Sequence, residues 1–280
     1  MAFRWKGRVA CQGVQKVSCQ RISWPAARVY KSNFCSRPTD SKRIGLDRKH
    51  KERAWTLTSQ WVDKWIVGEK LCPFAKPVRD RTDALRIRVS NANNLDELIY
   101  HFDEELSLIQ DGLSLEQLPS MEVQAHRSRT NSKFPETILL VIDNGAFIYP
   151  EMDRKLKNPD SKTGYLEDFL EFNRVSYDLQ SHLLKRDLVG HVQIVLFHPF
   201  GVHSMYTLES NLEPKAYAIR SPFPTFHILR EKDIMKGVKG GLYASPELIP
   251  AKNSIHLSEI DELNSRKGGV HGAWEKSFLG

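Results

Sequence analysis

The order of hydrophobic patterns along the chain restricts the fold more than any other sequence feature. Short alternating or continuous apolar runs, typical of strands, alternate with amphipathic helical stripes. The predicted strands are residues 84–90, 137–142, 191–197 and 224–229, and the main predicted helices are residues 50–71, 95–112, 165–184 and 255–263. This alternation predicts an α/β (α+β) fold, a two-layer sandwich with helices packed on a mixed sheet of about four strands. Prolines in the last strand favour an edge position for it.

Length and composition are those of a globular protein. The chain has 280 residues, of which 40% are hydrophobic, and a chain of this size buries roughly 75% of its unfolded surface without needing disulfides or metals. No apolar run approaches the roughly 20 residues of a membrane span. No linker divides the body of the chain, so we expect a single α/β domain over residues 41–280, with polar loop insertions near residues 113–135 and 152–163.

The N-terminus has a composition unlike that of the remaining chain. Residues 1–39 contain no Asp or Glu but eight of the 41 Lys and Arg residues. The remaining chain therefore has 33 basic and 34 acidic residues. An acid-free, Arg-bearing N-terminus is typical of an organellar transit peptide. We therefore predict that residues 1–40 are a disordered transit peptide for the mitochondrial matrix, with the plastid as the alternative. A basic tail without an import role is the other interpretation. Because the net positive charge resides in this segment, we expect no nucleic-acid partner for the mature chain.

Cysteine usage follows the same division. Cys11, Cys19 and Cys35 lie in the predicted transit peptide, and the remaining chain keeps only Cys72. A single cysteine excludes an internal disulfide and a four-cysteine metal site in the mature chain.

Three short segments carry the candidate chemistry. They are Leu-Cys-Pro-Phe-Ala at residues 71–75, Phe-His-Pro at 197–199, and Arg-Ser-Pro-Phe-Pro-Thr-Phe-His-Ile-Leu-Arg-Glu at 220–231. Ligand sites in open α/β sheets gather outside the carboxyl ends of strands, which is where His198 is expected. The candidate catalytic residues are therefore His198, Cys72 and His227, and the candidate substrate-binding residues are Arg220 and Ser221. Histidine suits proton transfer near neutral pH, and an arginine fork suits a carboxylate or phosphate.

Each candidate also has a structural interpretation. Cys72 can be a small buried apolar residue, a nucleophile, a metal ligand or a haem contact, and its position after a helix end does not favour the thiolate. His198 and His227 can serve the fold alone, and Arg220 with Ser221 can form a rigid turn. Cys72, His198 and His227 together would provide three ligands for a divalent metal such as zinc, although no short-spacing metal signature supports this.

The three segments together resemble those of the family called domain of unknown function 1415. That family has a tryptophan-bearing helix before Leu-Cys-Pro-Phe-Ala, a Phe-His-Pro segment after a strand, and Arg-Ser-Pro-aromatic-Pro before His-x-Leu-Arg-Glu. The resemblance covers roughly residues 54–274 and implies a compact α/β domain without a known activity. This chain departs from the family pattern at Phe200–Val202 and Ala218–Ile219, where apolar residues replace polar ones.

The leading hypothesis from the sequence is a soluble organellar protein with a polar pocket built from Cys72, His198, Arg220, Ser221 and His227. It would be an enzyme acting on a small anionic molecule. The alternative is a non-catalytic module that binds a metal, haem or a partner protein, and a pure scaffold is the third interpretation. The oligomeric state does not follow from the sequence.

Overall fold

The computed structural model describes residues 41–115, 134–143, 165–202, 213–239 and 248–280. All of them belong to one compact unit, Asp40–Gly280. The predicted transit peptide and most of the two predicted polar insertions lie outside the described residues. The strands are β1 (Leu85–Ser90), β2 (Thr137–Ile142), β3 (Val192–Phe197) and β4 (Thr225–Arg230). The helices are α1 (Ser41–Trp61), η1 (Val62–Val67), α2 (Ala75–Arg79), α3 (Leu95–Leu115), α6 (Phe169–Lys185), η2 (Pro214–Ala218), α7 (Glu231–Lys239), α8 (Leu248–Leu263), η3 (Ser265–Lys267) and α9 (Gly269–Leu279).

The four strands form one mixed sheet in the order β1-β2-β4-β3, which confirms the predicted fold class. β1 and β2 are parallel, whereas β4 is antiparallel to both β2 and β3. The expected edge position of the last strand is wrong, because β4 lies between β2 and β3. Its prolines do not interfere, since Pro224 precedes the first paired residue, Thr225, and every residue of the paired run can donate its N–H.

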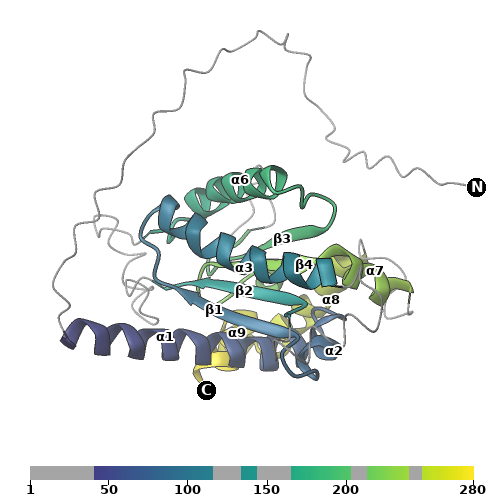
Figure 1. Ribbon diagram of the computed structural model, residues 1–280. Coiled ribbons are helices and arrows are strands. Elements are labelled where there is room, and N and C mark those ends of the chain that lie inside the picture. The colour runs from purple at the N-terminus through teal and green to yellow at the C-terminus, as the bar shows by residue number, and fades with distance from the viewer. Residues whose placement is uncertain (1–40, 116–133, 144–164, 203–212, 240–247) are drawn as a thin grey trace, which may run out of the picture. The chain divides into compact units, whose positions relative to one another are not determined.

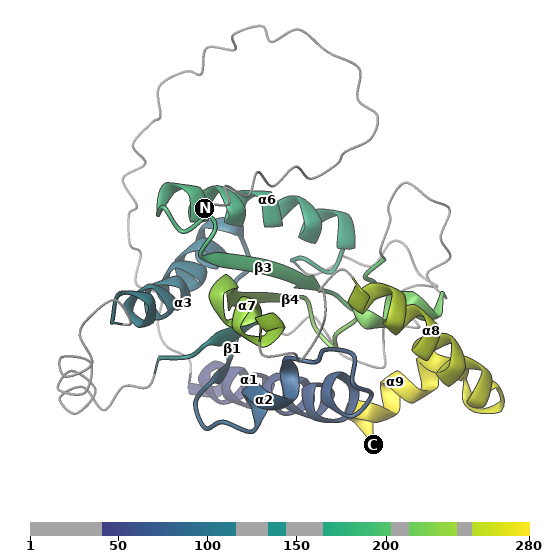
Figure 2. The same cartoon turned by 90° about the vertical axis from the view of Figure 1, so that its right-hand side faces the viewer.

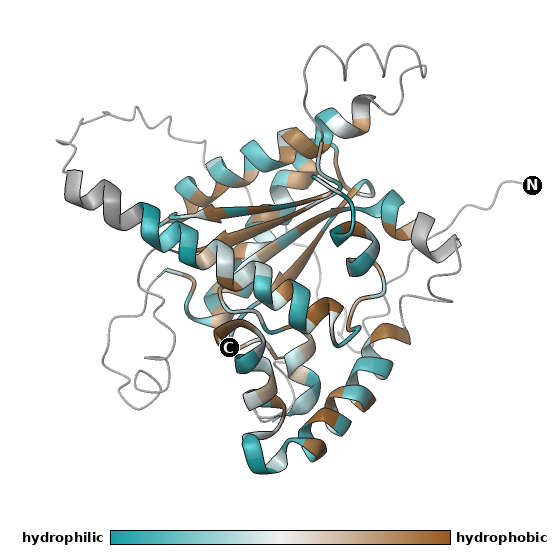
Figure 3. Cartoon of the chain, turned by 90° about the horizontal axis from the view of Figure 1, so that it is seen from below, coloured by the Kyte–Doolittle hydropathy of each residue, from teal (hydrophilic) through white to brown (hydrophobic). Residues whose placement is uncertain are grey.

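Helices cover both faces of the sheet, which adds a third layer to the two that were expected (Figures 1 and 2). α3 and α6 pack on the face that carries Ile138, Leu140 and Phe226. α1, η1, α8 and α9 form the core of the opposite face with Leu139 and Val141. Burial on both faces explains why β2 is a continuous apolar run. Brown predominates along the strands of the sheet in Figure 3.

Local sequence signals set the helix boundaries. The Asp168 carboxylate accepts hydrogen bonds from the N–H groups of Leu170 and Glu171 at 2.6 and 3.0 Å and caps α6. Asn94 caps α3 in the same way through the N–H of Glu97, at 2.9 Å. The sequence pattern did not reveal α9, which follows two glycines and buries Trp274 against the other aromatic residues of this face. No described helix is long and apolar enough to cross a membrane.

Candidate functional site

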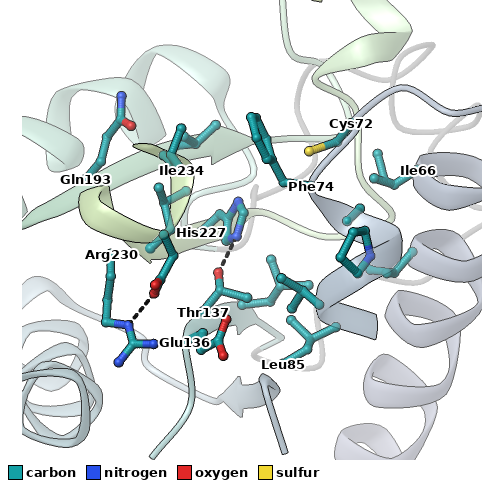
Figure 4. Close-up of a pocket in the computed structure, with 18 of the residues that line it drawn as sticks. Ile66, Cys72, Phe74, Leu85, Glu136, Thr137, Gln193, His227, Arg230 and Ile234 are labelled. Atoms are coloured by element: carbon teal, nitrogen blue, oxygen red, sulfur yellow. Dashed lines mark hydrogen bonds and ion pairs between the residues drawn. The ribbon is translucent and has the colours of Figure 1, made fainter. Parts of the chain in front are cut away.

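A cavity of about 610 Å³ lies over the sheet face that α1 and η1 cover (Figure 4). Its floor comes from all four strands, and its walls come from the end of α1, η1, α2, α7 and the start of α8. Its volume is within the range of pockets that hold a drug-sized ligand. The apolar lining residues are Trp61, Val62, Ile66, Phe74, Ala75, Pro77, Val78, Leu85, Leu139, Val195, Phe197, Leu229, Ile234 and Ile249.

The cavity wall that follows α1 contains a π-helix. Within η1 and just after it, backbone N–H groups bond five residues back, as from Gly68 to Asp63 at 3.1 Å and from Leu71 to Ile66 at 3.0 Å. The side chains of Val62 and Ile66 line the cavity from this segment. π-Helical turns are rare and often occur at functional sites, because the widened turn redirects side chains. The four-residue spacing of the tryptophans predicted a helix here but did not indicate its π-helical turn.

His227 is the titratable side chain on the cavity floor. It projects from the middle of β4 on the same face as Leu229, and its Nε2 lies 2.5 Å from the hydroxyl oxygen of Thr137. The Thr137 hydroxyl also donates to the carbonyl oxygen of Ile228, at 3.1 Å. Burial lowers the pKa of His227 to about 4, so the imidazole is neutral at physiological pH.

The charged groups that line the cavity are paired with each other. Arg81 makes a bidentate ion pair with Glu136, with N–O distances of 2.5 and 2.7 Å. Arg230 pairs through Nε with Asp233 at 2.6 Å. These four side chains contribute no net charge to the cavity. None of the four was a candidate from the sequence. Residues far apart in the chain form the first pair, and in the second pair Arg230 lies in the His-x-Leu-Arg-Glu motif, which gave it no role.

Cys72 lies in the cavity wall with its sulfur directed into the cavity (Figure 4). Burial raises the pKa of the Cys72 thiol, while backbone hydrogen bonds from Phe74 and Ala75 lower it by a smaller amount. The sequence placed this residue only after a helix end. In the structure it also precedes the start of α2, which explains the hydrogen bonds from these N–H groups. The net result is a neutral thiol near pH 7, which is a weaker nucleophile than a thiolate.

His198 lies beyond the carboxyl end of β3, as predicted, but its side chain packs on the opposite face of the sheet. The imidazole is completely buried, with its ring centroid 5.4 Å from that of Phe169 and 5.1 Å from that of Phe172. Nδ1 accepts from the N–H of Phe200 at 3.1 Å, and Nε2 therefore donates to the carbonyl oxygen of Leu166 at 3.0 Å. Burial lowers the pKa of His198 to about 4. Both ring nitrogens are thus used within the fold.

Arg220 and Ser221 are also buried away from the cavity lining. The Arg220 guanidinium lies 4.3 Å from the centre of the Tyr217 ring, with its Nε 3.5 Å from the carbonyl oxygen of Gly201. The Ser221 hydroxyl donates to the carbonyl oxygen of Phe223, within the turn that leads into β4. These contacts correspond to the rigid-turn interpretation of the sequence.

The structure therefore divides the five candidate residues. Cys72 and His227 line one cavity, whereas His198, Arg220 and Ser221 are not among its described lining residues. In the described part of the chain, no group of three or more His, Cys, Asp or Glu side chains is arranged to hold a metal ion. The three-ligand site of Cys72, His198 and His227 is accordingly not formed, because the two histidines project from opposite faces of the sheet.

Comparison with known proteins gives a family and no activity. A family model described as "Protein of unknown function (DUF1415)" matches residues 53–117 and 161–267, which confirms the resemblance carried by the three motifs. The match omits residues 118–160, a stretch that overlaps both predicted polar insertions. No curated protein and no solved structure matches the chain significantly.

Proposed function

We infer the function from the cavity itself, because the chain belongs to the family "Protein of unknown function (DUF1415)", whose name provides no substrate or reaction. We propose that this protein binds a small, largely apolar organic molecule in the cavity between the sheet and η1, α2 and α7. The observation that carries the proposal is the lining, an almost continuous apolar surface around about 610 Å³. Apolar pockets with a few polar groups are the usual form of small-molecule sites.

The geometry supports binding better than catalysis by the candidate residues. Burial keeps Cys72 a neutral thiol and makes His227 a weak base near pH 7. A small anion, the ligand class expected from the sequence, is less suited to this cavity. Its two arginines, Arg81 and Arg230, already pair with carboxylates, and Arg220 lies elsewhere.

Octan-1-ol titrated into the full-length protein by isothermal calorimetry tests the proposal. Burying an octyl chain at about 0.8 kcal/mol per CH₂ corresponds to roughly 6 kcal/mol, so we expect a dissociation constant between about 10 µM and 1 mM. Val195→Trp places a large side chain on the cavity floor and should abolish binding, and Ala75→Leu should weaken it from the wall.

Gln180→Trp on the exposed side of α6 is the matched control and should bind octan-1-ol as the natural protein does. Circular dichroism melting establishes that each variant is folded. Undetectable binding by the natural protein, or unchanged binding by both folded cavity variants, would contradict the proposal.

A further inference from the structure

The hydrogen bonds of His227 define which kind of ligand the cavity accepts. The Thr137 hydroxyl has one proton, and it donates that proton to the carbonyl oxygen of Ile228 at 3.1 Å. We assign the hydroxyl proton to this bond, and Nε2 of His227 then donates to the same hydroxyl oxygen across the short contact of 2.5 Å. A neutral imidazole that donates from Nε2 carries an acceptor lone pair on Nδ1.

The acceptor nitrogen of His227 is available to a ligand. Figure 4 shows this nitrogen turned away from Thr137, on the cavity side of the ring. No hydrogen-bond donor for Nδ1 occurs among the described residues, and the side chain retains partial exposure within the cavity. A buried acceptor is stabilised by a donor, and a ligand in the cavity can provide one.

The charge balance of the cavity restricts the ligand further. The Arg81–Glu136 and Arg230–Asp233 pairs leave the lining without net charge. An anionic head group next to His227 would lose its hydration and would also meet the acceptor lone pair instead of a donor. A neutral hydroxyl or N–H group has neither disadvantage.

On this basis, and resting on the proposed binding function, we infer that the ligand is a neutral, mainly apolar molecule with a hydroxyl or N–H group that donates to Nδ1 of His227. Thr137 is the positioning residue, because its hydroxyl fixes the tautomer that leaves Nδ1 unprotonated. The apolar part of the ligand lies against residues such as Phe74, Val195 and Leu229.

Three probes of matched length separate the alternatives in calorimetric titrations of the full-length protein at pH 7.5. Octan-1-ol is neutral and can donate, heptyl methyl ether is neutral and cannot donate, and octanoate is an anion. We expect octan-1-ol to bind about 10-fold more tightly than the ether, the difference made by one net hydrogen bond. Octanoate should bind more weakly than both.

Two variants test the roles of the residues. His227→Phe should retain binding of the ether within about 2-fold while the preference for octan-1-ol disappears. Thr137→Val should reduce that preference, because Nδ1 can then carry the proton, and Thr137→Ser should restore it. A residue needed only for folding would change the affinities of both neutral probes equally.

The outcomes distinguish this inference from the proposed function. Equal affinity for octan-1-ol and the ether, or tightest binding of octanoate, would overturn the inference but leave the cavity as a binding site. A preference for octan-1-ol that survives in folded His227→Phe would also overturn it. Failure of all three probes to bind would overturn both the inference and the proposed function.

Discussion

His198→Ala tests whether this histidine serves the fold rather than chemistry. The substitution removes the partners of the Leu166 carbonyl and the Phe200 N–H, and it empties the space beside the rings of Phe169 and Phe172. An unsatisfied buried group costs about 1–3 kcal/mol, and Phe200 is only partly buried. We therefore expect the free energy of unfolding at pH 7 to fall by about 2–4 kcal/mol.

The pH dependence of that loss provides a second criterion. The pKa of His198 is about 4 in the folded protein and about 6.5 in an unfolded chain. Between these values the unfolded state binds more protons, so the stability contributed by the neutral histidine is present above pH 6.5 and lost as the pH falls towards 4. A shift of this size corresponds to about 3 kcal/mol. The difference between the natural protein and His198→Ala should therefore shrink towards zero near pH 4.

Urea unfolding followed by circular dichroism at several pH values measures both effects. His191→Ala, an exposed histidine just before β3, is the matched control and should change the free energy of unfolding by less than about 0.5 kcal/mol. A His198→Ala variant as stable as the natural protein at pH 7 would refute the structural assignment. A loss that does not change between pH 7 and pH 4 would show that the imidazole is not buried in its neutral form.

Ser221→Ala should lower the free energy of unfolding by about 1–2 kcal/mol in urea titrations without changing octan-1-ol affinity, and a large loss of affinity would place Ser221 in the site. Iodoacetamide should label Cys72 more than about 10-fold more slowly than free cysteine at pH 7, measured by peptide mass spectrometry; faster labelling would indicate an activated thiolate. Residues 1–40 fused to a fluorescent protein should direct it to mitochondria, as seen by fluorescence microscopy. The double substitution Arg4→Glu and Arg8→Glu should abolish this import, and diffuse fluorescence of the unsubstituted fusion would contradict the transit peptide.

The sequence was sufficient to predict the strands and the main helices, because hydrophobic periodicity depends on local burial. The run at residues 137–142 coincides with β2, and the alternation at 84–90 gives β1. The position of β4 in the sheet was not predictable in this way, since strand order depends on long-range packing. The short helices α2 and η2 and the C-terminal α9 lack a long amphipathic stripe and were not found.

The candidate site was predicted only in part. Cys72 and His227 do line one cavity, and the period-two alternation along β4 explains why His227 projects opposite to Phe226 and Ile228. His198 follows Phe197 directly, so the alternation of β3 directs it to the opposite face from the cavity. Placement after a strand therefore predicted that His198 lies beyond the carboxyl end of β3. It did not predict which face of the sheet the side chain occupies.

The most direct test of the cavity as a ligand site is quenching of Trp61 fluorescence by 8-bromooctan-1-ol. Trp61 lies in the cavity wall, and a bromine atom quenches an indole that it contacts. The chain contains six tryptophans, so the Trp61→Phe variant identifies the signal of this one. We expect saturable quenching at concentrations that match calorimetric binding, and loss of that component in Trp61→Phe while octan-1-ol binding remains detectable by calorimetry. Quenching that rises without saturation, or that is unchanged in Trp61→Phe, would contradict ligand binding in this cavity.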